Sequence, residues 1–173
     1  MQSYIERVQR FPVVVSAPTP GAEFSIAIGG SNLSVPGLGA YRILSLTFQF
    51  VSSATVATRS FALVMDDQTT TYLQVGAPGS QAASLTEQYA AFEGSTGGGA
   101  NGPVNHFAWP TPAAVLYPGH RLRSVTTNIQ IGDQYSNIAM LVEELPSGRY
   151  FQTQPIDRVM AEPWEPGMGA MTP

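Results

Sequence analysis

The sequence contains no cysteine and no lysine, and it is poor in charge of either sign. The absence of cysteine excludes disulfides, thiolate catalysis and cysteine zinc sites. Charged residues make up 12% of the 173 residues, about half of the usual ~25%, and all eight basic residues are arginine. The net charge of -4 argues against a nucleic-acid partner, because such proteins normally carry a basic patch.

Long hydrophobic runs are also missing. No run approaches the ~18 apolar residues that a membrane-spanning helix needs, so we expect no membrane partner. Residues 1–7 lack the basic start of a signal peptide, and the apolar run Val13–Val15 is too short for its hydrophobic region. We therefore expect the protein to stay in the cytoplasm in which it is made, unless it leaves as part of a larger particle.

The scarcity of charge allows two interpretations of the surface. Protein surfaces that stay in water are typically ~25–35% charged, whereas the centres of interfaces lose Lys, Glu and Asp but keep Arg and aromatic residues. The chain is therefore either a Ser/Thr-rich β protein solvated by hydroxyl groups or a subunit that hides much of its surface in an assembly. We favour the subunit.

What the sequence does contain is a series of short segments with strand periodicity, separated by turns rich in its 17 glycines and 14 prolines. The clearest runs from Tyr41 to Val51, where Leu44, Leu46, Phe48 and Phe50 are expected on one face. Other strands are expected at 24–28, 61–65, 69–75, 113–117, 120–131 and 137–145. A turn is expected at 76–79, and 82–92 is expected to be a strand, with a short helix as the alternative. In 120–131, Val125, Thr127, Ile129 and Ile131 are expected on one face.

About eight strands separated by turn signals predict an all-β fold, an antiparallel β-sandwich or jelly roll over residues 23–148. Within it, residues 93–112 read as a long loop. Residues 1–22 and 149–173 read as extended N- and C-terminal arms, because proline recurs there without periodicity. Apolar residues in the arms and the loop are predicted to contact neighbouring subunits: Tyr4, Ile5, Phe11, Phe107, Trp109, Met160 and Trp164.

Motifs for chemistry are scarce. The two histidines, His106 and His120, each follow a turn, and no nucleophile, zinc or phosphate-loop motif accompanies them. The pair Asp66-Asp67 is expected to begin a hairpin turn, with a calcium site as the alternative. We predict no catalytic residue, no metal and no cofactor, and hence no enzyme.

Two further interpretations concern side chains that lie on or beside strands. Arg121 and Arg123 alternate along one strand and are expected to pair across the sheet with Glu143 or Glu144. The aromatic residues Phe107, Trp109 and Tyr117 are expected in the core or an interface, and stacking on a sugar ring is the alternative.

Residues 117–145, from Tyr-Pro-Gly-His-Arg-Leu-Arg to Met-Leu-Val-Glu-Glu-Leu, and residues 41–59, from Tyr-Arg-Ile-Leu-Ser-Leu-Thr-Phe to Val-Ala-Thr-Arg, resemble small virion structural proteins of tailed bacteriophages. The resemblance covers about 48 residues and carries no catalytic motif. The chain is similar to jelly-roll proteins that decorate or cement capsids, often as trimers. The alternative is a resemblance to a tail, collar or portal-vertex component.

That resemblance implies a virion protein assembled in the host cytoplasm. Its expected partners are copies of itself, with a trimer favoured, and the major capsid protein or another virion protein. A jelly-roll module on a tail or fibre that binds a host-surface glycan is the second hypothesis.

Overall fold

The structure, a computed structural model, describes residues 9–28, 39–98, 104–111 and 113–145. In these ranges the regular elements are all strands. The strands are β1 (Arg10–Val15), β2 (Ser25–Ala27), β3 (Ala40–Val51), β4 (Arg59–Asp66), β5 (Thr71–Gln81), β6 (Thr86–Phe92), β7 (Thr96–Gly98), β8 (Val104–Ala108), β9 (Val115–Leu116), β10 (Arg121–Thr127) and β11 (Gln134–Leu145).

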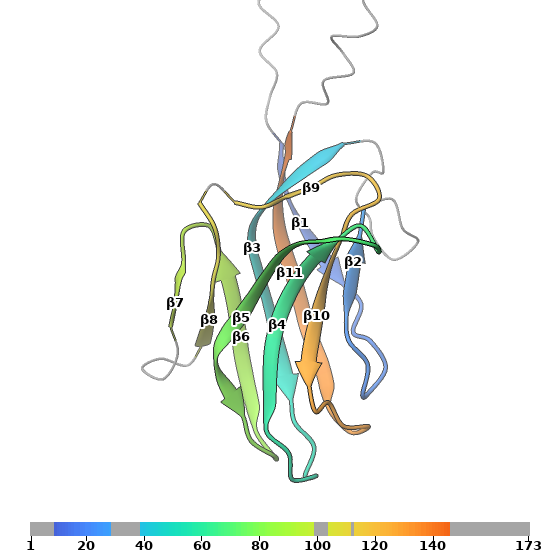
Figure 1. Ribbon diagram of the computed structural model, residues 1–173, viewed down its shortest axis with the longest axis vertical. Helices are drawn as coiled ribbons and strands as arrows, with labels where there is room; N and C mark the ends of the chain where they lie inside the picture. The colour runs from blue at the N-terminus through green and yellow to red at the C-terminus, as the bar shows by residue number, and fades with distance from the viewer. Residues whose placement is uncertain (1–8, 29–38, 99–103, 112, 146–173) are drawn as a thin grey trace, which may run out of the picture.

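Within the described residues, eight of these strands form two facing layers (Figure 1). One layer has the order β1-β11-β3-β6 and the other β2-β10-β4-β5, and every pairing among the eight is antiparallel. This order is that of a jelly roll, in which the chain crosses between the two sheets. Strands β8 and β7 extend the first layer beyond β6, and β9 pairs with β3; we call this layer the larger sheet. The predicted all-β sandwich is confirmed.

Strand β3 shows how a bulge changes the face that a residue occupies. Leu141 of β11 pairs with Ser45, but the next residue, Val142, pairs with Ile43, so Leu44 is an extra residue on β3. Beyond such a bulge the alternation of faces is reversed. Ile43 therefore lies in the core, and the prediction that Leu44 shares the core face is wrong.

Strand β10 faces the core with the opposite set of residues from the one predicted. Leu122, Ser124 and Thr126 point inward, and the face of Val125 points outward. The hydroxyls can be buried because the Glu23 carboxylate accepts hydrogen bonds from Ser124 Oγ and from the Thr126 amide, both at 2.5 Å. Buried polar groups that are fully paired cost little, so this polar face can lie inside.

The predicted N-terminal arm is partly wrong. Residues 10–15 form β1, which pairs along its whole length with β11, and Val13 and Val15 are buried. A strand with half of its side chains in the core belongs to the domain. The predicted C-terminal arm, residues 149–173, lies outside the described residues.

The predicted loop at 93–112 contains two strands. β8 pairs in parallel with β6, and β7 pairs with β8 in antiparallel fashion. The Trp109 amide donates to the Ser95 carbonyl at 2.8 Å, and Ser95 Oγ donates to the Phe107 carbonyl at 2.5 Å. The physical reason is burial, because Phe107 has no exposed surface and draws the segment onto the domain.

Strand β5 continues through the turn predicted at residues 76–79. It tolerates Pro78 because β5 is the edge strand of the smaller sheet, where a missing N–H breaks no ladder. At the first edge of the larger sheet, β1 carries Pro12. The two other edge strands, β2 and β7, are three residues long.

The core between the sheets is built around aromatic rings. Tyr135 contacts three phenylalanines at ring-centroid distances of 4.7–5.5 Å. Its hydroxyl hydrogen-bonds with Thr126, and burial raises the pKa of the tyrosine above its usual value. Edge-to-face arrangements of this kind add stability beyond the buried area alone. The partners are Phe24, Phe48 and Phe50.

One end of the sandwich is closed by a buried ion pair. Arg59 binds both carboxylate oxygens of Asp133 at 2.9 Å, and neither side chain has exposed surface. The guanidinium also donates to the carbonyls of Ala57 and Thr55. This pair ties the β3–β4 connection to the β10–β11 connection, at the lower end of Figure 1. We call it the Arg59 end.

Candidate assembly surface

The outer face of the larger sheet is nearly free of charge across four or five strands. Residues directly opposite each other in paired strands share one face of the sheet. The register therefore defines two rows on the side away from the core. One row is Pro12, Leu141, Ser45 and Phe92, and the next is Val14, Ala139, Thr47, Ala90 and His106. We call these two rows the outer face.

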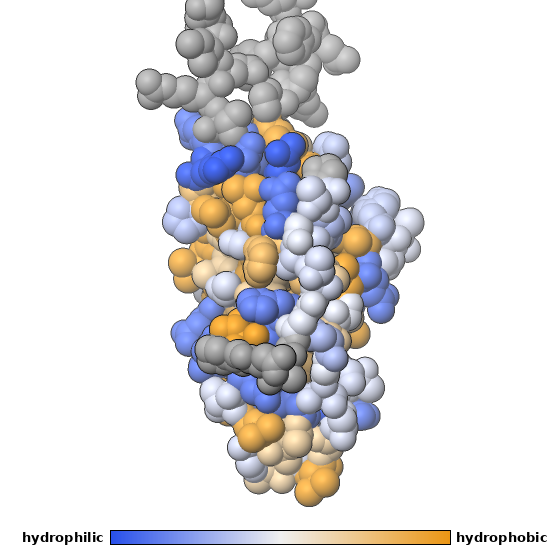
Figure 2. Space-filling model, turned by 90° about the vertical axis from the view of Figure 1, so that its left-hand side faces the viewer, coloured by the Kyte–Doolittle hydropathy of each residue, from blue (hydrophilic) through white to orange (hydrophobic). Residues whose placement is uncertain are grey.

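Three large apolar side chains of the outer face are open to water. Val14 is 80% exposed, Phe92 43% and Leu141 37%. Single exposed apolar residues are ordinary on proteins, but a sheet with one solvated face normally alternates apolar inside with polar outside. Here the outward positions are apolar, small or hydroxyl-bearing, apart from His106 at one end of a row. Figure 2, which faces the β7–β8 side, shows apolar residues reaching the surface along the body of the molecule.

A ladder of charged side chains borders the outer face at one end. Glu143 of β11 lies 3.2 Å from Arg10 on one neighbouring strand and 3.8 Å from Arg42 on the other. The three residues are directly opposite one another in the register, so they continue the rows of the outer face. This arrangement has the composition of an interface, with an uncharged centre and a polar rim that includes arginine.

Sequence reasoning missed the outer face for an identifiable reason. The runs 11–15 and 139–142 are apolar at successive positions, but Val13–Val15 is considered above only as the hydrophobic region of a signal peptide and 139–142 only as part of a strand. In a strand, successive residues point to opposite sides, so an apolar run means that both sides are apolar. That signal, at Pro12 and Val14 and again at Leu141, could have identified the face.

The residues predicted to contact other subunits are found in different surroundings. Phe107 is fully buried and Trp109 is 3% exposed, so both lie in the core of their own domain and the predicted contact is wrong for them. Phe11 is partly buried and packs edge-to-face on Tyr41 at 5.9 Å. The others lie outside the described residues: Tyr4, Ile5, Met160 and Trp164.

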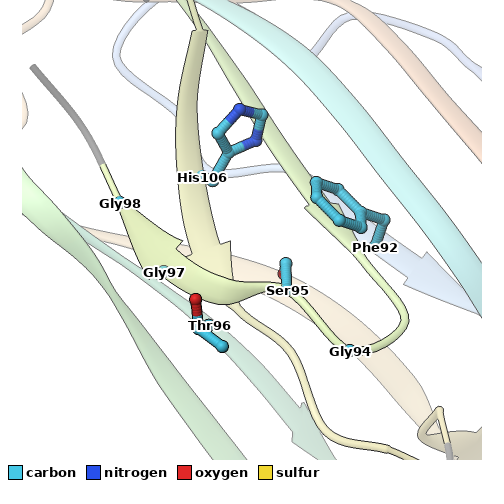
Figure 3. Close-up of a pocket in the computed structure, with 7 residues that line it drawn as sticks. All are labelled: Phe92, Gly94, Ser95, Thr96, Gly97, Gly98 and His106. Carbon is cyan, nitrogen blue, oxygen red and sulfur yellow. The ribbon is translucent and has the colours of Figure 1, made fainter. Parts of the chain in front are cut away.

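A shallow pocket of about 240 Å³ lies at the β7–β8 end of the outer face (Figure 3). It is lined by Phe92, His106 and residues 94–98. The rings of Phe92 and His106 are 5.4 Å apart in an edge-to-face contact. No described Asp, Glu or Arg side chain lines the pocket, which offers one phenyl ring, one imidazole and glycine-rich backbone.

The second histidine, His120, stacks against Tyr72, with the ring centroids 4.8 Å apart. It belongs to a different part of the surface from His106, which contacts Phe92. Among the described residues, no group of three or more His, Asp or Glu side chains is arranged to hold a metal ion. Asp66 and Asp67 lie at the β4–β5 turn as predicted, with Asp67 accepting hydrogen bonds from Thr69 and Thr70.

The predicted partners of the strand arginines are wrong. Arg121 and Arg123 both bind Asp66, at 2.5 and 2.7 Å, because Asp66 lies directly opposite Arg121 on β4. The hydrogen bond from Arg121 is the main cause that lowers the pKa of the Asp66 carboxyl to about 2. Glu143, one of the predicted partners, belongs to the ladder at the border of the outer face.

Comparisons with known proteins were made for the whole chain. No protein-family model matches it, and no curated protein matches it. The chain is similar to part of a solved structure titled "Structure of infectious bursal disease virus Gt strain", with 11% sequence identity and a TM-score of 0.37. The match covers 80% of this chain and 33% of the other, so the chain spans about a third of that protein's length. No helix in the described residues is long and apolar enough to cross a membrane.

Proposed function

We propose that the protein is a non-enzymatic structural subunit of a virus particle that associates with copies of itself through the outer face. More specifically, it attaches to the capsid of a tailed phage as a decoration or cement subunit, with a trimer as the favoured form. The observation that carries the proposal is the uncharged outer face with its three exposed apolar side chains.

A second copy is the occupant that fits this face best. In a closed trimer each copy contacts its two neighbours through different patches, so the outer face packs on another part of the next copy. Burying Val14, Leu141 and Phe92 there removes their apolar surface from water, at roughly 25 cal/mol per Å². The two uncharged rows impose no unpaired charge on such a contact. In the ladder at the border the side chain of Arg10 is 65% exposed, so the rim offers an arginine to a carboxylate of a neighbouring copy.

The terminal segments are the second part of the proposal. Tyr4 and Ile5 precede β1, and Met160 and Trp164 follow β11, the two strands that pair at one side of the larger sheet. These apolar residues would bind the capsid or a neighbouring subunit. Removal of residues 150–173 is then expected to abolish attachment to capsids while the far-UV circular dichroism of the β fold is kept.

Solution mass tests the self-association. For the full chain, light scattering over a range of concentrations is expected to approach about 55 kDa, three times the 18.4 kDa of one chain. The variants Leu141→Glu and Phe92→Glu are expected to shift the mass to that of a monomer. Val56→Glu, at a residue 93% exposed at the Arg59 end, is the matched control and keeps the wild-type mass. A wild-type monomer at every concentration would overturn self-association.

A tail, collar or fibre-associated module is the alternative location in the particle. Co-sedimentation with purified capsids and with tails separates the two, since a decoration subunit pellets with capsids alone. The alternative is favoured by one observation, the exposed aromatic cluster at the end of the sandwich opposite Arg59, which is described next.

A further inference from the structure

The β4–β5 turn and the start of β10 lie at the upper end of the sandwich in Figure 1. Three aromatic side chains from the segments around them contact one another. The rings of Tyr72 and His120 are stacked, with centroids 4.8 Å apart and planes 25° apart. Tyr117 meets His120 edge-to-face at 5.4 Å. Tyr72 is 51% exposed and Tyr117 53%, so two tyrosines present half of their surface to water. We call these three residues the aromatic platform.

A β-bulge places Tyr72 in the platform. Met65 pairs with Leu73, but the next residue, Asp66, pairs with Thr71, so Tyr72 has no residue opposite it. Bulges redirect one side chain away from the regular pleat and are frequent beside functional sites. In a regular ladder Tyr72 would lie opposite a residue of β4. In the bulge it has no such partner, and its ring stacks on His120, the residue before β10.

The platform is held in place although it is exposed. The Tyr72 hydroxyl donates a hydrogen bond to Asp67 Oδ2. The other oxygen of Asp67 accepts from the Thr69 hydroxyl at 2.6 Å and from the Thr70 amide at 2.6 Å. Hydrogen bonds, led by that from Thr69, hold the pKa of the Asp67 carboxyl below its usual range, so it stays ionised as an acceptor. An exposed ring that is already ordered loses little freedom when it binds a ligand.

The charges around the platform cancel. Asp66 binds Arg121 and Arg123, and Asp67 binds Tyr72, so two carboxylates stand beside two guanidinium groups. A surface with no excess of either sign gives an anion no preference over a neutral ligand. The ligand class is therefore an uncharged one that presents both apolar C–H groups and hydroxyls.

We propose that the aromatic platform of Tyr72, His120 and Tyr117 binds a neutral pyranose ring of a glycan. The C–H face of a pyranose is weakly positive and stacks on the negative face of an aromatic ring. Arg121 and Arg123, whose side chains keep about a third of their surface exposed while bound to Asp66, supply donors for sugar hydroxyls beside the platform. The site lies on loops and strand ends away from the outer face, and it does not depend on self-association.

Saturation-transfer NMR of the full chain tests the proposal with maltose, lactose and diacetylchitobiose as neutral probes and sialyllactose as the charged one. At least one neutral probe is expected to bind saturably in the millimolar range. Tyr72→Ala and Tyr117→Ala should each weaken that binding roughly three- to tenfold, because each removes one stacking surface. Tyr72→Phe keeps the ring but not the bond to Asp67, and should weaken it less.

Matched controls distinguish binding from folding. Ile131→Ala alters a residue that is 91% exposed at the opposite end and is expected to leave binding unchanged. Circular dichroism and the unfolding midpoint confirm that the tyrosine variants are folded. The proposal is overturned if no neutral probe binds, if the alanine variants bind as the wild type does, or if sialyllactose binds more tightly than every neutral probe. A change of solution mass in these variants without sugar binding would instead assign the platform to a subunit contact.

Discussion

The arginine–aspartate pairs at the two ends of the sandwich differ in how far they are exposed to solvent. At the Arg59 end the pair has no exposed surface, and its guanidinium makes five hydrogen bonds. At the other end, which we call the Tyr72 end, Asp66 is buried while Arg121 and Arg123 keep about a third of their side-chain surface exposed. A closed pair fixes loops, whereas an open pair leaves donors for a ligand. The difference separates an end built for stability from an end built for contact.

Breaking the closed pair should have the largest effect. Arg59→Met leaves Asp133 buried without its counter-charge and leaves the Thr55 and Ala57 carbonyls unpaired. We expect the free energy of unfolding to fall by about 3–5 kcal/mol in urea titrations. A loss below about 1 kcal/mol would show that the Arg59 end is no more constrained than the Tyr72 end.

Asp66→Asn should have a smaller effect, because its partners are partly solvated. The variant loses two charge-assisted hydrogen bonds, and we expect a loss of about 1.5–2 kcal/mol near neutral pH. The same urea titration measures it. If Asp66→Asn costs more than Arg59→Met, the proposed division between the two ends is wrong.

Acid should expose the contribution of Asp66. Its folded pKa of about 2 lies below the usual 3.8, so the unfolded chain binds the proton more readily. The stability that Asp66 contributes is therefore fully present above about pH 4 and is lost as the pH falls through about 2. The gap in stability between wild type and Asp66→Asn should close over this range. A gap that stays constant with pH would mean that the arginine pairs do not act through charge.

Substitution of the exposed apolar residues at the Arg59 end should have the smallest effect. Val56 is 93% exposed and Ile131 91%, and the lower tip of the molecule in Figure 2 is largely apolar. Val56→Ser and Ile131→Ser should each change the unfolding free energy by less than about 0.5 kcal/mol in thermal unfolding. A larger change in the unfolding free energy would show that the side chains of Val56 and Ile131 make packing contacts despite their exposure.

The sequence predicts the fold class and most of the long strands, since apolar and polar residues alternate over 46–50 of β3 and every second residue over 61–65 of β4 is large and apolar. Prediction from the sequence fails where the conformation of a segment depends on residues far away in the sequence. The bulge at Leu44 depends on the register with β11, and the inward face of β10 depends on Glu23, a hundred residues away. The strands inside 93–112 depend on Phe107 finding the core.

The candidate sites were less predictable than the fold. Sugar stacking by Tyr117 is only the alternative to core or interface packing in the sequence. Tyr72, the other tyrosine of the platform, lies 45 positions earlier and is brought there by a bulge and by His120. The outer face required knowledge of which apolar residues point outward, and this depends on register. Pairing of Asp66 with two arginines across the sheet has no local signal in either segment.

The edge strands of the two sheets affect whether copies of the protein can aggregate by strand addition at high concentration. Proline interrupts the edge strands β1 and β5, and the edge strands β2 and β7 are three residues long. Among the described residues, each edge therefore offers another chain only a short or interrupted ladder of hydrogen bonds. Growth of a fibre by strand addition is thereby suppressed. Copies at high concentration can then contact one another only through side-chain surfaces, and contacts of that kind can form and separate reversibly.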